Sequence, residues 1–234
     1  MTVTVSRLAL SPIRDRSRQA APQVFESLRE AIINLELVPG TVLSRQELQL
    51  QFGLSSTPVR DALMKLAEES LVDIFPQHAT VVSRIDLRLT RQAHFLRRSI
   101  ETEAVQTLAQ TPNPALIAAL RRTLALQLSL ADGDDYTAFN DADQAFHKQL
   151  YEAAEVPDLY TLVRRQSGHI DRLRRLYLPI KGRPRQIVSD HTAIVDAIES
   201  GDPEHARAAL RHHLARSLAD SAAIRAKYPD YFRD

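Results

Sequence analysis

Short breaks containing proline or glycine divide residues 86–234 into long segments with no strand pattern. They fall at residues 111–114, 132–133, 156–157, 182–184 and 201–203. Between the breaks, apolar residues recur at helical spacing, which predicts about six helices, at roughly 88–110, 114–131, 135–153, 156–178, 184–200 and 203–226. Because the connections are short, we expect neighbouring helices to run antiparallel in an all-α bundle.

Residues 21–85 show three shorter helical segments. The apolar face of the first segment repeats every three to four residues, at Val24, Leu28, Ile32 and Leu35. Pro39-Gly40 is a turn signal that ends it. Ser44 and Glu47 form a capping box at the start of the second helix. Thr57, followed by Pro58, begins the third helix.

Two β-rich runs, at 71–75 and 80–82, flank a turn and predict a hairpin. Three helices followed by a hairpin form a winged helix-turn-helix, whose third helix would enter the major groove of DNA. Small hydroxyls, an arginine and a helix N-terminus suit phosphate contact and base readout. The candidate DNA-binding residues are Arg45 and Gln46 on the second helix, Ser55, Ser56, Thr57 and Arg60 at the third, and Gln77 and His78 at the hairpin tip.

Net charge gives this DNA-binding hypothesis no support. The chain carries 30 basic and 29 acidic residues, and residues 1–85 hold nine of each. The hypothesis therefore depends on local arrangement. Residues 1–20 contain four arginines without apolar periodicity, which favours a flexible arm over an arm that contacts DNA.

Polar side chains interrupt the apolar faces of three predicted bundle helices. Asp143 and His147 are four residues apart on one helix and therefore share a face. His191 is in register with the apolar residues of the helix at 184–200, and His213 stands beside leucines on the last helix. One carboxylate and three imidazoles are thus predicted to point into the bundle.

A single histidine on an apolar face is usually a hydrogen-bonded core residue. Four converging polar groups need a common explanation, because an unpaired polar group is costly to bury. Metal coordination supplies one, and the absence of cysteine restricts the ligands to nitrogen and oxygen. An aspartate with three histidines suits Zn, Ni, Mn or Fe and leaves positions open for water or a ligand oxygen.

The stretch between residues 164 and 185 is rich in arginine and lysine. One interpretation is a solvated helix face and loop. In the other, part of the stretch guards an anion pocket, with Arg172 and Arg185 as contributors to effector binding.

Two blocks of the sequence resemble a known family. The run LSSTPVRDALMKLAEESLV is similar to the recognition-helix block of the GntR family of regulators. The patterns Asp-x-x-Phe-His, Asp-His-x-x-Ile and His-Leu, which begin at residues 143, 190 and 213, resemble the FCD effector domain of FadR-type members. The resemblance covers roughly residues 22–220.

The resemblance implies roles for individual residues. It makes Asp143, His147, His191 and His213 the metal ligands, and it favours His213 over the neighbouring His212 because His213 keeps the His-Leu pair. It also implies that Arg97, four residues before Glu101, faces the pocket and binds the carboxylate of an effector.

The sequence also departs from the family pattern. Ser56 stands where an arginine is common, and Ser70 and Ala79 replace common glycines. These departures affect the expected base preference and the geometry of the wing.

The predicted organisation is an arm at 1–20, a winged helix-turn-helix at 21–85, and an all-helical effector-binding and dimerisation domain at 86–234. We expect a homodimeric transcription regulator that acts as a repressor. We also expect it to be cytoplasmic and without a membrane partner, because no stretch has the apolar length of a membrane span or of a leader. Its partners would be a palindromic double-stranded DNA operator and a small carboxylate effector bound at the metal.

Two other functions fit parts of the pattern. A metal with open positions could activate water in an enzyme. No additional acid–base pair stands out at motif spacing, which favours a non-enzyme. The metal could instead be the signal itself, but a metal with open positions suits holding a ligand better.

Overall fold

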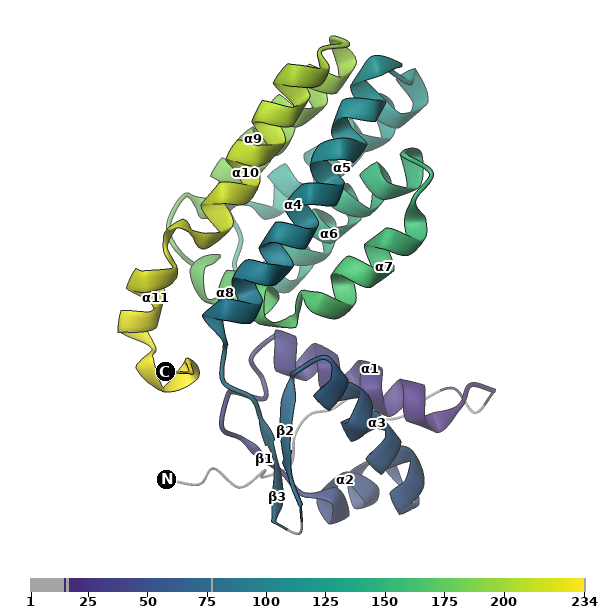
Figure 1. Ribbon diagram of the computed structural model, residues 1–234, viewed down its shortest axis with the longest axis vertical. Coiled ribbons are helices and arrows are strands. Elements are labelled where there is room, and N and C mark those ends of the chain that lie inside the picture. The colour runs from purple at the N-terminus through teal and green to yellow at the C-terminus, as the bar shows by residue number, and fades with distance from the viewer. Residues whose placement is uncertain (1–14, 16, 77, 234) are drawn as a thin grey trace. The chain divides into compact units, whose positions relative to one another are not determined.

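The computed structural model of the chain describes residues 15, 17–76 and 78–233, which form two compact units (Figure 1). The first unit contains the described residues up to Leu87 together with the segment that starts at Arg225. The second unit is Arg88–Ile224. The predicted fold class, mainly helical with a winged helix-turn-helix followed by a helical bundle, is confirmed. Most of the arm at 1–20, and Gln77 at the hairpin tip, lie outside the described residues.

The first unit combines three helices with a small antiparallel sheet. Its elements are α1 (Ala20–Ile33), β1 (Val42–Leu43), α2 (Arg45–Phe52), α3 (Ser56–Glu68), β2 (Val72–Phe75) and β3 (Ala79–Val82). The sheet has the order β1-β3-β2, and β2 and β3 form the predicted hairpin. Strand β1 was not predicted, because a strand of two residues is too short to show an alternating pattern.

The helix boundaries in this unit correct two details of the prediction. Helix α1 ends at Ile33, and Leu35 lies beyond it with a φ of 60°, so the buried Leu37 packs in the core instead. Helix α3 begins at Ser56 with Ser55 as its N-cap, rather than at Thr57. The cap of α2 is as predicted, since the Ser44 hydroxyl accepts a hydrogen bond from the backbone N–H of Glu47 at 3.3 Å.

A segment from the far end of the sequence completes the first unit. Ile85 donates its backbone N–H to the carbonyl of Tyr231 at 2.7 Å, and its own carbonyl accepts from Arg233 at 2.9 Å. These bonds form a parallel bridge between Ile85 and Phe232, both of which are buried. The sequence predicts one domain at 86–234, whereas the segment from Arg225 lies in the first unit. A single long-range bridge leaves no local pattern from which this pairing could be predicted.

The second unit is an all-α bundle. Its helices are α4 (Leu87–Gln110, entering from the first unit), α5 (Pro114–Leu130), α6 (Tyr136–Ala153), α7 (Pro157–Gln166), α8 (Gly168–Tyr177), α9 (Arg183–Glu199), α10 (Pro203–Ala219) and α11 (Ser221–Lys227, continuing into the first unit), and a 3₁₀ turn at Pro229–Tyr231 follows. Helix α5 packs on α6 and α9, and α9 packs on α10 (Figure 1). Within the described chain, no helix is both long and apolar enough to cross a membrane.

Two predicted helices are divided in the structure. The segment at 156–178 breaks at Ser167, and the segment at 203–226 breaks at Asp220. At Ser167 the side-chain hydroxyl donates to the carbonyl of Val163 at 2.7 Å, a local bond of the kind that bends helices. The break lets α8 enter the interior, where every residue from Gly168 to Arg174 is buried.

Ser70 gives a test of backbone strain in the first unit. It has a φ of 58°, in the left-handed region that favours glycine. Replacing Ser70 with glycine is expected to raise the free energy of unfolding by about 0.5–1 kcal/mol, because the Cβ strain disappears. Glu68→Gly, at the exposed last residue of α3, should instead lower it by up to about 1 kcal/mol. Urea unfolding followed by circular dichroism measures both changes, and a loss of stability in both variants would contradict the strain.

Candidate metal centre and nucleic-acid interface

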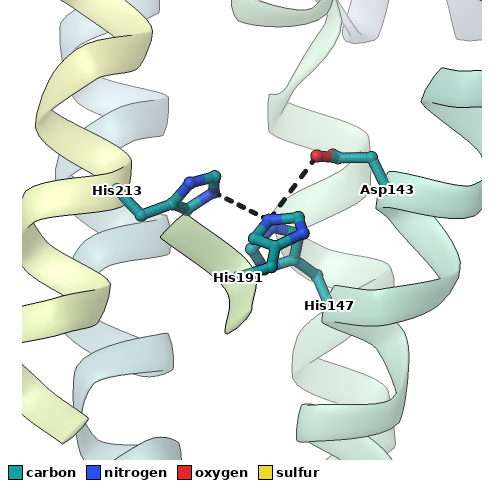
Figure 2. A group of neighbouring side chains, drawn as sticks. All are labelled: Asp143, His147, His191 and His213. Carbon is teal, nitrogen blue, oxygen red and sulfur yellow. Dashed lines mark hydrogen bonds and ion pairs between the residues drawn. The ribbon is translucent and has the colours of Figure 1, made fainter. Parts of the chain in front are cut away.

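Four buried side chains meet inside the helical unit (Figure 2). Asp143 and His147 come from α6, His191 from α9 and His213 from α10. One ligand atom of each residue lies within 4.8 Å of the corresponding atoms of the others. The structure therefore brings together the carboxylate and the three imidazoles that the sequence placed on inner faces. The neighbouring His212 is exposed and bonds to Arg216.

The atoms that face one another in this cluster suit a divalent cation. Nε2 of His191 lies 3.2 Å from Nε2 of His213 and 3.7 Å from Oδ1 of Asp143. Oδ1 of Asp143 and Nε2 of His147 are buried without a hydrogen-bond partner among the described residues. Buried lone pairs without partners are costly, and a shared cation would satisfy all of them. One oxygen and three nitrogen donors fit Zn, Ni, Mn or Fe.

Each imidazole has a polar group near its outer nitrogen. Nδ1 of His147 lies 2.9 Å from Oε2 of Glu101, and Nδ1 of His191 lies 2.9 Å from Oε1 of Gln127. Nδ1 of His213 lies farther, 3.7 Å, from Oδ2 of Asp190. Only the contact to Gln127 has hydrogen-bond geometry, and it fixes the tautomer and orientation of His191, so that its Nε2 is left for a metal. Nδ1 of His147 and Nδ1 of His213 have no hydrogen-bond partner among the described residues.

Gln127, which is not among the residues that the sequence singles out, is part of this site. A signal was present, because Gln127 continues the buried face formed by Ile117, Leu120 and Leu124 on α5. A glutamine in such a stripe needs a buried polar partner. His191 is further held by its ring stacking on Phe146, with centroids 4.1 Å apart.

Burial and neighbouring charges keep the cluster ready to bind a cation. Burial lowers the pKa of His147 to about 4, with Arg97 acting in the same direction. Burial and the ring of His213 hold the pKa of His191 well below its usual range. Burial alone would raise the pKa of Asp143, but Arg174 and His147 outweigh it and keep this pKa well below normal. At neutral pH, Asp143 is therefore an anion, and His147 and His191 are neutral.

A cavity adjoins the cluster and carries several cationic side chains. Its lining includes Asp143 and His147 together with Arg97, Arg164 and Arg174. Arg97 bonds to Glu101 at 2.7 Å, and Arg174 bonds to Asp143 at 2.5 Å. The sequence-based candidate Arg97 therefore faces the cavity, while Arg174 and Arg164 were missed.

The other two candidate effector contacts lie elsewhere. Arg172 is buried, but it bonds to the carbonyl of Gly168 and to Nδ1 of His169. Arg185 is exposed and pairs with Asp132. Neither belongs to the lining of the cavity beside the cluster. Several arginines close together on one helix cannot be told apart by sequence until the orientation of that helix is known.

In the first unit, the candidate DNA-binding residues lie on two exposed sites. Ser55, Ser56, Thr57 and Arg60 are all exposed at the start of α3. The Ser55 side chain makes no capping hydrogen bond, so its hydroxyl is not used to cap the start of the helix. Arg45 and Gln46 at the start of α2 line a groove together with His78 of the β2–β3 turn.

Both units match known families. Residues 20–82 match the model described as bacterial regulatory proteins, gntR family, and residues 92–216 match the FCD domain. An HTH-type transcriptional regulator in an unstable DNA locus of Streptomyces ambofaciens is 38% identical over 89% of this chain and 88% of its own length. The HTH-type transcriptional repressor RspR of Escherichia coli is 26% identical over 91% of this chain and 93% of its own.

A solved structure has the same fold. The structure titled E. coli McbR/YncC superimposes with a TM-score of 0.74 and covers 90% of this chain and 99% of its own. The two sequences are 22% identical. The matching families and relatives are transcription regulators rather than enzymes.

Gln127 should act as a positioning residue for metal binding. Gln127→Leu is expected to weaken Zn²⁺ affinity by about 10–100-fold, because Nδ1 of His191 loses the acceptor that fixes its tautomer. Gln127→Glu, which keeps an oxygen acceptor, should retain most of the affinity. Gln149→Leu is the matched control, since Gln149 bonds to Thr123 across the same α5–α6 interface. Competition titration with a chelator gives the affinities, and equal values for the two leucine variants would contradict the role.

Proposed function

The chain belongs to the gntR family of bacterial regulatory proteins and carries an FCD domain, and we propose that this DNA-binding transcription regulator is a repressor controlled by a small organic acid. The acid would bind at a metal held by Asp143, His147, His191 and His213. The observation that carries the proposal is the meeting of these four ligands beside an arginine-lined cavity. The repressor assignment rests on the relative RspR, which is named a repressor.

DNA recognition is assigned to the exposed start of α3. The Arg60 side chain is 62% exposed, and among the described residues its ion pair is a 3.5 Å contact with the neighbouring Asp61. A loosely held arginine can reach the base edges of the major groove. The hydroxyls of Ser55, Ser56 and Thr57 would contact phosphates, and Arg45, Gln46 and His78 would contact the flanking backbone. Gln77 keeps its sequence-based assignment to the wing tip.

Effector binding is assigned to the cavity next to the four ligands. Its volume of about 20 Å³ holds about one water molecule, so the lining side chains would have to move apart to admit an acid. A divalent ion supplies, when bound, a positive charge that attracts a carboxylate. Arg97 contributes a guanidinium, which can bind a carboxylate through two hydrogen bonds. Because Glu101 accepts from Arg97 and also approaches His147, it ties the arginine to the cluster.

Operator affinity can respond only if the effector prefers one arrangement of the protein over another. Arg97 and Glu101 lie on α4, which begins at Leu87, directly after the segment that leaves the sheet. A shift of α4 on effector binding would move this segment. Couplings of this kind are typically about 1–3 kcal/mol.

The regulator is proposed to act as a cytoplasmic homodimer. A two-fold protein presents two recognition helices to the two halves of a palindromic operator. Dimerisation is assigned to the helical unit, which also carries the proposed effector site. Native mass spectrometry reports the dimer, the metal and any co-purified acid in one measurement.

Arg60→Ala tests the DNA-binding assignment. Operator binding should weaken by about 1–3 kcal/mol if Arg60 makes a groove contact. Lys65→Ala, at an exposed position in the last turn of the same helix, removes the same charge away from the N-terminal turn and serves as control. Gel-shift titration on an operator selected with the wild-type protein measures both. An unchanged affinity for Arg60→Ala would refute its role.

His213→Ala tests the metal and effector assignments. It should lower the metal content and abolish the response of DNA binding to the acid, while basal DNA binding remains. His212→Ala changes the adjacent, exposed histidine and should leave all three properties intact. Elemental analysis and gel shifts in the presence of a panel of small carboxylates report the outcome. Full-strength acid binding by metal-free His191→Ala/His213→Ala protein would overturn the model.

A further inference from the structure

The ionised side chains around the four-ligand cluster form two closed pairs. Nε of Arg97 lies 2.7 Å from Oε1 of Glu101, and Nη2 of Arg174 lies 2.5 Å from Oδ2 of Asp143. None of these four side chains is more than 9% exposed. Their formal charges therefore cancel inside the bundle.

The third arginine of the cavity is balanced in the same way. Arg164 bonds to both carboxylate oxygens of Asp171, at 3.2 and 2.8 Å, and the Asp171 side chain is 2% exposed. An imidazole that coordinates a metal does so through a lone pair and is neutral. A divalent ion among the four ligands would therefore add two positive charges that no side chain of these pairs compensates.

Uncompensated charge is expensive to bury. A ligand with one negative charge would leave one positive charge in the interior, and a ligand with two would leave none. The charge balance of these three pairs and the metal therefore favours a doubly charged anion.

Arg174 is a cavity side chain with a donor to spare. Its side chain is 3% exposed, and its buried Nε has no hydrogen-bond partner among the described residues. Arg97 is bonded through a different nitrogen, since its Nε donates to Glu101. A buried N–H without an acceptor is unfavourable. A second anionic group of the ligand would accept a hydrogen bond from Nε of Arg174 and remove that cost.

We propose that the effector is a dianion, a compact dicarboxylate, and that Arg174 receives its second negative charge and so determines specificity for dianions over monoanions. This inference rests on the proposed function, because it assumes that a small acid binds beside the metal. Beyond that function, it specifies the charge of the effector and the residue that recognises this charge.

The wild-type protein loaded with Zn²⁺ gives the first test. Calorimetry would compare malonate with propionate, succinate with butyrate, and adipate with hexanoate, so that each pair differs by one carboxylate at constant chain length. The dianion of the best-bound pair should bind at least about tenfold more tightly, as expected for one added charge-assisted hydrogen bond.

Two results of this comparison would overturn the inference and leave the proposed function intact. One is equal affinity for monoanion and dianion. The other is tight binding of a monoanion with release of one proton for each site, because hydroxide would then supply the second charge. If no acid bound to the zinc-loaded protein, the proposed function would fail together with the inference.

Arg174→Lys tests the assigned residue. Lysine keeps a positive charge beside Asp143 but removes the Nε donor, so the preference for the dianion should fall to within about threefold. Arg175→Lys is the control on the same helix, where Nη2 of Arg175 donates to Thr137, and it should keep the preference. Elemental analysis should show unchanged zinc in both variants. A full dianion preference in Arg174→Lys would overturn the role of Arg174.

Discussion

The buried ion pair between Arg174 and Asp143 constrains how the helical unit is built. Oδ2 of Asp143 is neutralised by the guanidinium, so Oδ1 can face the histidines. To supply this guanidinium, α8 has to pass through the interior with polar residues on nearly every side. Removing either partner would leave a buried charge without compensation, which typically costs about 3–5 kcal/mol. Ion pairs therefore hold the polar core together, whereas apolar packing of α4, α5, α6, α9 and α10 holds the rest of the bundle.

The bundle and the start of α3 both use arginine and other polar side chains, but they hold these side chains in opposite ways. In the bundle, arginines and histidines are paired and fixed by neighbours before a ligand arrives, which reduces the loss of side-chain entropy on binding. At the start of α3, the hydroxyls and Arg60 are exposed and loosely held. A recognition surface has to exchange water for phosphate and base contacts, whereas a buried ion site has to exclude water from the outset.

Sequence reasoning succeeded where a local signal reports the structure. The breaks at proline and glycine, the Ser44 cap and the hairpin all have local causes. The register of apolar stripes placed Asp143, His147, His191 and His213 on inner faces because helical period alone decides which residues share a face. The sequence could not separate Arg172 from Arg174. Residues two apart lie slightly more than half a turn apart on a helix, and only the docking of α8 decides which one reaches Asp143.

The pairing of Ile85 with the segment around Phe232 makes the first unit discontinuous in sequence. Ribosomes synthesise the chain from its N-terminus, so the helices and hairpin of this unit leave the exit tunnel before Phe232 has been translated. The backbone groups of Ile85 must stay hydrated until the whole helical unit has followed. A message broken after the codon for His213 would therefore yield a chain with all four candidate ligands and an unfinished first unit.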